Sequence, residues 1–295
     1  MKIAVLGVGG FLGNALFRFF DKPGNEVMAL GRRKPAVLSD EQFRTLDTNS
    51  DTFELLFDYH LIINCVGAGV QSNYQVAQDE LYHVNLQFPI RLISYLQNTG
   101  FTGQLVTFGT YFEIGNDPIR QVYSEDQLLA AVNKVSNHYC ASKRLLTRFV
   151  QSWKVNFCHF HLILPTIYGF GEPKHRLLPY LVSCAKNNQI PHMSDGTQIR
   201  QYLHVQNLCE IVLALNRLTE RESRFLNLPA EFTCSVRQLA ERVYTFFGLT
   251  LPASTFGLQA TRDSLMPYLI LSDVRYQRLR LPTPVDFLEK SLLLY

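Results

Sequence analysis

The chain has 295 residues, of which 47% are hydrophobic and 18% charged, and its formal net charge at pH 7 is +3. This composition is typical of a soluble globular protein with a substantial core, and it excludes a disordered chain. The charge is too small, and the basic residues too scattered, to predict nucleic acid as the main partner.

Strand-like and helical patterns alternate through the first half of the chain. Short apolar runs typical of buried strands lie between segments with helical spacing. In chain order we expect a strand at Ile3–Leu6, a helix over residues 11–20, strands at Glu26–Leu30 and Leu61–Val66, a helix from about Glu80 to Gln97, a strand at Gln104–Phe108, a helix over residues 136–153 and a strand at His159–Leu164. This alternation predicts an α/β fold with a parallel, doubly wound sheet of the Rossmann type.

The alternation of strands and helices is interrupted after Pro165, where the segment PTIYGFGEP is rich in proline and glycine. Later we expect helices at Leu177–Asn187 and over residues 236–247, and a strand followed by a helix within residues 201–218. Residues 1–164 should therefore form the cofactor domain, with residues 200–218 returning to it. Residues 165–199 and 219–295 should form a smaller, discontinuous lobe for the substrate. That lobe should cover the carboxyl ends of the strands, where open α/β folds bind ligands.

The cysteines and the apolar segments favour a cytoplasmic protein without a metal site. The six cysteines form no CxxC pair and no cluster with histidine at zinc spacing. The N-terminal MKIAVLGVGG lacks the order of regions of a signal peptide. The run FCHFHLILPTIYGF is interrupted by two histidines and Pro165, so it is too short and too polar to span a bilayer. We expect no membrane partner.

Glycines at the end of the first strand predict a dinucleotide-binding turn. The segment GVGGFLG places Gly7, Gly10 and Gly13 between a strand and a helix. Such glycines allow a tight turn, close approach of the backbone to a pyrophosphate, and close packing of the helix on the strand. Phe11 and Leu12 open the helix and belong to the same predicted cofactor site. The alternative is a glycine-rich turn without a ligand.

The end of the second strand favours NADP(H) over NAD(H). NAD-binding proteins usually carry an acidic residue there, which holds the ribose hydroxyls. This chain has Gly31-Arg32-Arg33-Lys34 and no acid. A guanidinium can grip a 2′-phosphate through two hydrogen bonds, whereas a carboxylate would repel it. We therefore assign Arg32 and Arg33 to the cofactor site, with a solvated basic turn as the alternative.

The hexapeptide HYCASK places Tyr139 and Lys143 four residues apart on an expected helix. This spacing puts both side chains on one face, where such pairs meet whatever their purpose. The pair alone therefore does not decide between a catalytic device and an ordinary helical turn.

Six segments in order resemble the extended short-chain dehydrogenase/reductase family, and within it the branch of nucleotide-sugar epimerases, dehydratases and reductases. They are GVGGFLG, IINCVGA, TFGTYFEIG, HYCASK, PTIYGFG and RQYLHVQNL, and they span most of the chain. The resemblance implies an NAD(P)-dependent enzyme that acts on a nucleotide sugar. It also implies a homodimer.

The resemblance implies a role for each residue of the catalytic group. Tyr139 would be the general acid or base that acts on a substrate oxygen. Lys143 would bind the nicotinamide ribose and, through its charge, lower the pKa of the tyrosine. Thr110 would hydrogen-bond the same substrate oxygen.

Further positions match the family's binding sites, although ordinary turn, packing or surface roles remain as alternatives for several of them. The cofactor positions are Asp47, Thr48, Cys65, Val66, Gly67, Asn85, Pro165 and Ile167. The substrate positions are Ala68, Thr110, Tyr111, Arg176 and Arg200.

The residues after Thr110 restrict the reaction that the resemblance allows. Dehydratases of the family carry an Asp-Glu pair directly after the threonine, where this chain has Tyr111-Phe112, and Glu113 lies one place too far along. Phe112 also occupies the place of a cysteine that some epimerases use. Reduction of a nucleotide-linked 4-keto-6-deoxyhexose and 4-epimerisation therefore remain, and the two arginines favour the reductase. A non-catalytic NADP(H)-sensing regulator is an alternative of another class, which the retained Tyr139 and Lys143 disfavour.

Overall fold

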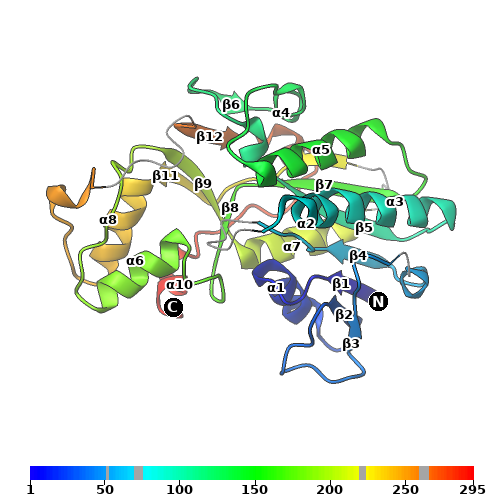
Figure 1. The fold of residues 1–295 in the computed structure, drawn as a ribbon. Coiled ribbons are helices and arrows are strands. Elements are labelled where there is room, and N and C mark those ends of the chain that lie inside the picture. Colours follow the sequence, from blue (N-terminus) through cyan, green and yellow to red (C-terminus); the bar gives the residue numbers. More distant parts are fainter. Residues whose placement is uncertain (51–52, 70–75, 219–223, 259–265) are drawn as a thin grey trace.

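The computed structural model describes residues 1–50, 53–69, 76–218, 224–258 and 266–295, and a parallel sheet forms its larger lobe (Figure 1). Seven strands lie in the order β10-β7-β5-β4-β1-β2-β3, and all their pairings are parallel. They are β1 (Lys2–Leu6), β2 (Glu26–Gly31), β3 (Phe43–Thr45), β4 (Leu61–Asn64), β5 (Gln104–Thr110), β7 (Cys158–Leu164) and β10 (Arg224–Asn227). The predicted doubly wound sheet is confirmed. Its strand order reverses between β1 and β4, and ligands bind at such a switch point.

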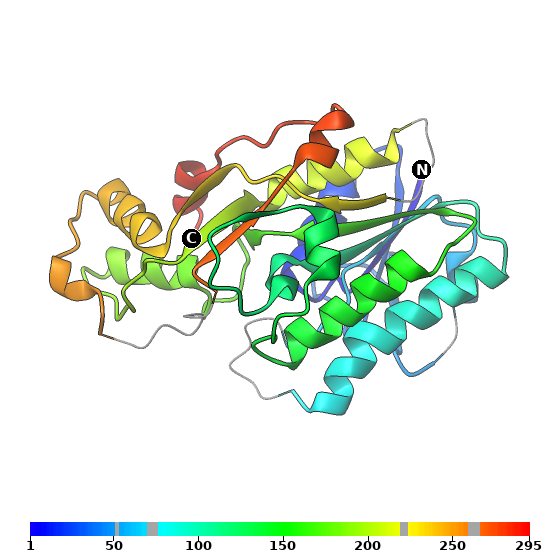
Figure 2. The same ribbon diagram turned by 90° about the horizontal axis from the view of Figure 1, so that it is seen from above.

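Helices cover both faces of this sheet (Figures 1 and 2). Helices α1 (Phe11–Phe20) and α7 (Val205–Asn216) pack on one face, and α2 (Gln78–Tyr82), α3 (Phe88–Asn98) and α5 (His138–Ser152) lie on the other. Alternate residues of β1 supply the two cores: Ile3 and Val5 face α1 and α7, whereas Ala4 and Leu6 face α3. A strand buried on both faces therefore reads as a continuous apolar run.

The helix predicted from Glu80 to Gln97 contains a π-helical turn. The turn η2 (His83–Gln87) joins α2 to α3, and Pro89 lies in the first turn of α3. A π-helical turn inserts one extra residue per turn and is frequent at functional sites. Here it carries the buried Asn85.

The second lobe contains a smaller sheet and its own core. Its strands lie in the order β11-β9-β12-β6, with β8 beside β9. They are β6 (Val122–Tyr123), β8 (Thr166–Tyr168), β9 (Ile199–His204), β11 (Phe232–Ser235) and β12 (Tyr268–Leu271). Helices α6 (Leu177–Lys186), α8 (Val236–Phe246) and α10 (Leu288–Leu292) share this lobe's apolar core. The short elements η1 (Glu54–Leu56), η3 (Tyr111–Ile114), α4 (Glu125–Ala130), η4 (Ala253–Thr255) and α9 (Val274–Arg278) complete the described structure.

The chain crosses between the two sheets more often than the sequence analysis expects. Helix α7 packs in the core of the larger lobe, as expected for residues 200–218, but β9 before it belongs to the second sheet. Strand β10 falls in the segment assigned to the substrate lobe, yet it pairs with β7. Conversely, β6 lies in the segment assigned to the cofactor domain and pairs with β12. Strands of two to four residues have too short a pattern to indicate their partners.

None of the described helices is long and apolar enough to cross a membrane.

Candidate active site

The glycine turn is a close contact between three backbone segments. Gly7 has a φ of +84°, which favours glycine, and a Cβ atom there would lie 2.8 Å from the nitrogen of Val66. A Cβ on Gly13 would lie 2.3 Å from the carbonyl oxygen of Gly7. No side chain caps the first turn of α1, which begins after Gly10. Its amide N–H groups can therefore meet a phosphate, and this backbone fits the pyrophosphate of a dinucleotide.

Two exposed arginines follow β2 at the same edge of the sheet. Arg32 lies 3.4 Å from the carboxylate of Glu80, in an ion pair between two exposed side chains. Arg33 follows it and is also exposed. After the next strand, Asp47 was expected at the cofactor. Its Oδ1 accepts the backbone N–H of Asn49 at 2.8 Å, so its side chain closes a local turn here.

A buried asparagine joins the segment after β4 to the helix that carries the tyrosine. Asn85 Oδ1 accepts the N–H of Ala68 at 2.8 Å, and its Nδ2 donates to the Ala68 carbonyl at 2.9 Å. The same Nδ2 also lies 3.1 Å from the hydroxyl of Ser142, which donates to the carbonyl of Tyr139. Asn85 thereby holds the Cys65–Ala68 segment beside α5.

The predicted catalytic residues meet where β5 ends. Asn137 caps α5 by accepting the N–H of Cys140 at 2.9 Å, which places Tyr139 in the first turn and Lys143 one turn later. Thr110 is the last residue of β5, and its side chain lies close enough to Tyr139 to act on the pKa of the phenol. Lys143 Nζ donates to the carbonyl oxygen of Phe108 at 3.0 Å. Three residues far apart in sequence thus form one polar group.

The electrostatics of this group suit a tyrosine that donates a proton. Burial raises the pKa of Tyr139 above its usual value of 10, and Glu113 raises it further, whereas Arg176 and the hydrogen bond with Thr110 lower it. Burial also lowers the pKa of Lys143. The expectation was that Lys143 lowers the pKa of the tyrosine, but in this structure the ammonium is directed to the Phe108 carbonyl. The phenol of Tyr139 is therefore protonated at neutral pH.

The structure separates the three polar side chains that were predicted to bind substrate beside Ala68 and Thr110. Arg176 pairs with Glu172 at 3.1 Å, and its guanidinium carbon lies 6.0 Å from the ring centroid of Phe11. Its charge also lowers the pKa of Tyr139. By contrast, Tyr111 is fully buried with its hydroxyl on Thr166, and Arg200 is 4% exposed. In this conformation these two belong to the protein interior.

Pro165 and Ile167 border the site at the end of β7 and in β8, and both are buried. The sequence analysis did not single out the groups that hold Arg176. Glu172 accepts from Arg176 and also from the hydroxyl of Tyr295. The i, i+4 spacing of Glu172 and Arg176 is a signal that could have found this pair.

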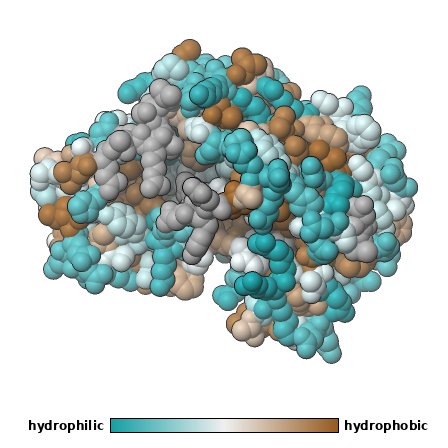
Figure 3. Space-filling view, viewed as in Figure 1, coloured by the Kyte–Doolittle hydropathy of each residue, from teal (hydrophilic) through white to brown (hydrophobic). Residues whose placement is uncertain are grey.

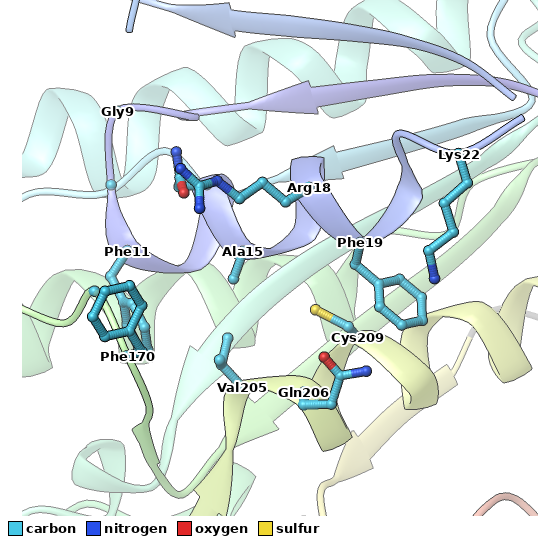
Figure 4. Close-up of a pocket in the computed structure, with 13 residues that line it drawn as sticks. Gly9, Phe11, Ala15, Arg18, Phe19, Lys22, Phe170, Val205, Gln206 and Cys209 are labelled. Atoms are coloured by element: carbon cyan, nitrogen blue, oxygen red, sulfur yellow. The ribbon is translucent and has the colours of Figure 1, made fainter. Parts of the chain in front are cut away.

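A pocket of about 490 Å³ lies between α1 and α7 and borders the glycine turn (Figure 4). Side chains of both helices line it, among them Ala15, Arg18 and Cys209. Thr110, Tyr139 and Lys143 are not among its lining residues. The surface is hollowed between the larger lobe and the second lobe (Figure 3). Within the described parts of the chain, no cluster of histidine, cysteine or acidic residues could hold a metal ion.

The sequence matches a family model and two characterised relatives. The model of the NAD dependent epimerase/dehydratase family matches residues 3–228. The dTDP-6-deoxy-L-talose 4-dehydrogenase (NAD(P)(+)) of Kitasatospora kifunensis is 29% identical over 180 residues, which are 60% of this chain and 56% of that protein. The chain thus spans little more than half the length of this relative. The CDP-abequose synthase of Yersinia pseudotuberculosis is 21% identical over 243 residues, or 79% of this chain and 81% of that protein.

Solved structures share the fold along the whole chain. The dTDP-glucose 4,6-dehydratase DesIV of Streptomyces venezuelae, with NAD and TYD bound, has a TM-score of 0.80 at 18% identity and covers 100% of this chain and 97% of its own. MoeE5 in complex with UDP-glucuronic acid and NAD has a TM-score of 0.80 at 19% identity. The match covers 99% of this chain and 97% of the MoeE5 chain. At this identity the likeness shows the fold alone.

Proposed function

Because the chain belongs to the NAD dependent epimerase/dehydratase family and is an NAD(P)-dependent enzyme, we propose that it reduces a nucleotide-linked 4-keto-6-deoxyhexose with NADPH. The retained Tyr139 and Lys143 disfavour a regulator without catalysis. The name of the Kitasatospora relative supports the reaction, because a 4-dehydrogenase run in reverse reduces a 4-ketone. The nucleotide and the sugar are left to experiment.

The observation that carries the proposal is the meeting of Thr110, Tyr139 and Lys143 at the end of β5, with no acid–base pair directly after Thr110. A ketone reduction needs one proton donor, and the raised pKa of Tyr139 suits that role. Dehydration needs further acid–base groups, but Tyr111 is buried and Phe112 has no ionisable group. Epimerisation would start with Tyr139 as a base, which its raised pKa disfavours.

We propose the following division of roles. The cofactor, when bound, supplies hydride to the carbonyl carbon. Tyr139 then donates its proton to the carbonyl oxygen, and the hydroxyl of Thr110 holds that oxygen in place. The ammonium of Lys143 holds the cofactor ribose. Arg176, beside Phe11, would meet the diphosphate of the nucleotide sugar.

The proposal is tested with purified protein, NADPH and a panel of nucleotide-4-keto-6-deoxyhexoses. We expect NADPH absorbance to fall in a one-to-one ratio with the ketone consumed, and the product to be a 4-hydroxy sugar of one configuration. Unchanged NADPH with every ketone would overturn the reductase for that panel. Ordinary nucleotide-hexoses are then supplied, and isomerisation without net redox change would establish the 4-epimerase instead.

The preference for NADPH is expected to depend on Arg33. Replacing it with alanine removes a guanidinium that would bind the 2′-phosphate, so the KM for NADPH should rise about tenfold while the KM for NADH stays the same. Lys34→Ala is the matched control, because Lys34 belongs to the same basic run but pairs with Asp40. Equal changes in both KM values would contradict the proposed phosphate contact.

The homodimer implied by the family resemblance stays a prediction. Leu145 of α5 is 46% exposed and Trp153, directly after this helix, is 50% exposed, and an interface could cover both. Light scattering after size-exclusion chromatography measures the mass of the protein in solution. A mass close to 33.8 kDa would mean a monomer and contradict the prediction.

A further inference from the structure

A fully buried carboxylate lies directly behind the catalytic group. Glu113, in η3, is 0% exposed, and its Oε1 accepts the backbone N–H of Thr110 at 2.8 Å. Its Oε2 is buried without a hydrogen-bond partner. A buried oxygen without a partner is costly, and the cost is greater when the group is charged.

An ordinary capping role explains only half of this arrangement. Thr110 and Glu113 form a capping box, in which the third residue of a helix accepts the N–H of the capping residue. A glutamine would accept that N–H equally well, and its side chain need not ionise. The capping box therefore does not explain why Oε2 is buried without a partner. It also does not explain why this fully buried position has an acid.

Polar and charged side chains from two elements surround Glu113. Helix α5 presents Tyr139, Lys143 and Arg144 to it, and the Nε of Arg144 donates to its backbone carbonyl at 2.7 Å. Behind it lies His161 of β7, whose Nε2 is 2.8 Å from the hydroxyl of Thr147.

The two buried histidines of β7 do not add positive charge. The Thr107 hydroxyl joins them, at 2.7 Å from His161 Nδ1 and 2.8 Å from His159 Nε2. Burial lowers the pKa of both rings below 6.5, so both are neutral at neutral pH. Cys65, directly after β4, acts on the pKa of Lys143, and burial raises the pKa of its own thiol, so it is neutral as well. Lys143 and Arg144 are therefore the cations that face Glu113.

We propose that Glu113 is a positioning residue that holds Thr110 through one oxygen and, when ionised, holds Lys143 in its cationic form. The inference rests on the proposed function, because it takes Lys143 and Tyr139 as the residues of the reaction. Glu113 would act on the reaction through Thr110 and Lys143. Its ionisation would make turnover depend on pH close to neutrality.

The direction of the pH dependence follows from the ionisation of Glu113. Burial raises the pKa of Glu113 from 4.5 to about 7. The nearby Thr147 hydroxyl, the hydrogen bond from the Thr110 backbone and the charges of Lys143 and Arg144 oppose this rise. Burial lowers the pKa of Lys143, and the charge of Glu113 opposes this. Above pH 7 the anion therefore supports the lysine cation, and below pH 7 a neutral acid gives no such support.

The first test compares Glu113→Gln with the unchanged enzyme across pH. The amide keeps the acceptor for Thr110 but has no charge, so kcat should be nearly the same at pH 6 and about tenfold lower in the variant at pH 8.5. Glu125→Gln is the matched control, because this acid is also buried and accepts a backbone N–H, that of Asn227, at 3.0 Å. The ratio of the kcat of Glu125→Gln to that of the unchanged enzyme should not vary with pH. A ratio for Glu113→Gln that is the same at every pH would overturn the inference.

The second test does not depend on turnover. Because the folded-state pKa of Glu113 is raised, the unchanged protein should lose stability as pH rises from about 4.5 through 7. Glu113→Gln lacks this loss, so its Tm relative to the unchanged protein should be higher at pH 8 than at pH 5. A difference in Tm that is constant with pH would show that Glu113 does not ionise in this range. If no ketone is reduced, the proposed function fails, and this measurement still decides the ionisation.

Discussion

Replacement of Tyr139 by phenylalanine is expected to lower kcat of the proposed reduction by about 10³-fold, while the affinity for NADPH stays within about twofold. The change removes the hydroxyl that we propose as the proton donor, and it leaves the ring in place. Stopped-flow measurement of NADPH oxidation gives kcat, and fluorescence titration gives the affinity. A loss that is confined to KM would mean that Tyr139 binds substrate without taking part in the chemistry.

A second tyrosine serves as the control for this variant. The hydroxyl of Tyr82 lies 3.0 Å from His138 Nδ1, at the first residue of the same helix, and has no assigned role. Tyr82→Phe should leave kcat unchanged. If both variants lost activity equally, the effect would come from the start of α5 and not from a proton donated by Tyr139.

Replacement of Gly13 by alanine should have the largest effect on stability. The new Cβ would lie 2.3 Å from the carbonyl oxygen of Gly7 and 2.7 Å from its carbonyl carbon, both of which are backbone atoms that cannot rotate away. Helix α1 must then move off the turn. We expect a loss of about 3 kcal/mol in the free energy of unfolding, a Tm lower by about 5 °C, and at least a tenfold loss in affinity for NADPH.

The same loop provides the control for Gly13. A Cβ on Gly9 would meet nothing within 4 Å, so Gly9→Ala should leave the Tm unchanged. Differential scanning calorimetry and NADPH titration of both variants compare the two sites directly. An unchanged Tm for Gly13→Ala would contradict the close contact between α1 and the glycine turn.

Local patterns were sufficient for the parallel sheet and for the placement of Tyr139 and Lys143 on one face of a helix. The continuous apolar runs of β1, β4 and β5 indicate strands buried on both faces. The GxxGxxG spacing places glycines where strand, turn and helix touch. The spacing of Tyr139 and Lys143 follows from one helical turn. Each of these signals extends over fewer than about ten residues, so the sequence displays it directly.

Other features depend on contacts between distant segments. Arg176 and Arg200 look alike in the sequence, but only Arg176 acts on the pKa of Tyr139, whereas Arg200 is buried in β9. In the same way, Tyr111 was expected to contact the substrate, but its side chain lies in an apolar core. Which side chain faces the site depends on how the second sheet packs, and periodicity within one segment does not carry that information.

The sequence alone thus determined the sheet, the glycine turn and the placement of Tyr139 and Lys143 on one helical face, because short-range spacing and periodicity specify all three. The tertiary structure decided that β10 joins the larger sheet, that Asn85 ties Ala68 to α5, and that Glu113 lies buried behind Thr110. The physical reason is that burial and ionisation depend on neighbours from several segments. Glu113 is an ordinary acid in the sequence, and only the packing of α5 and β7 around it raises its pKa to about 7.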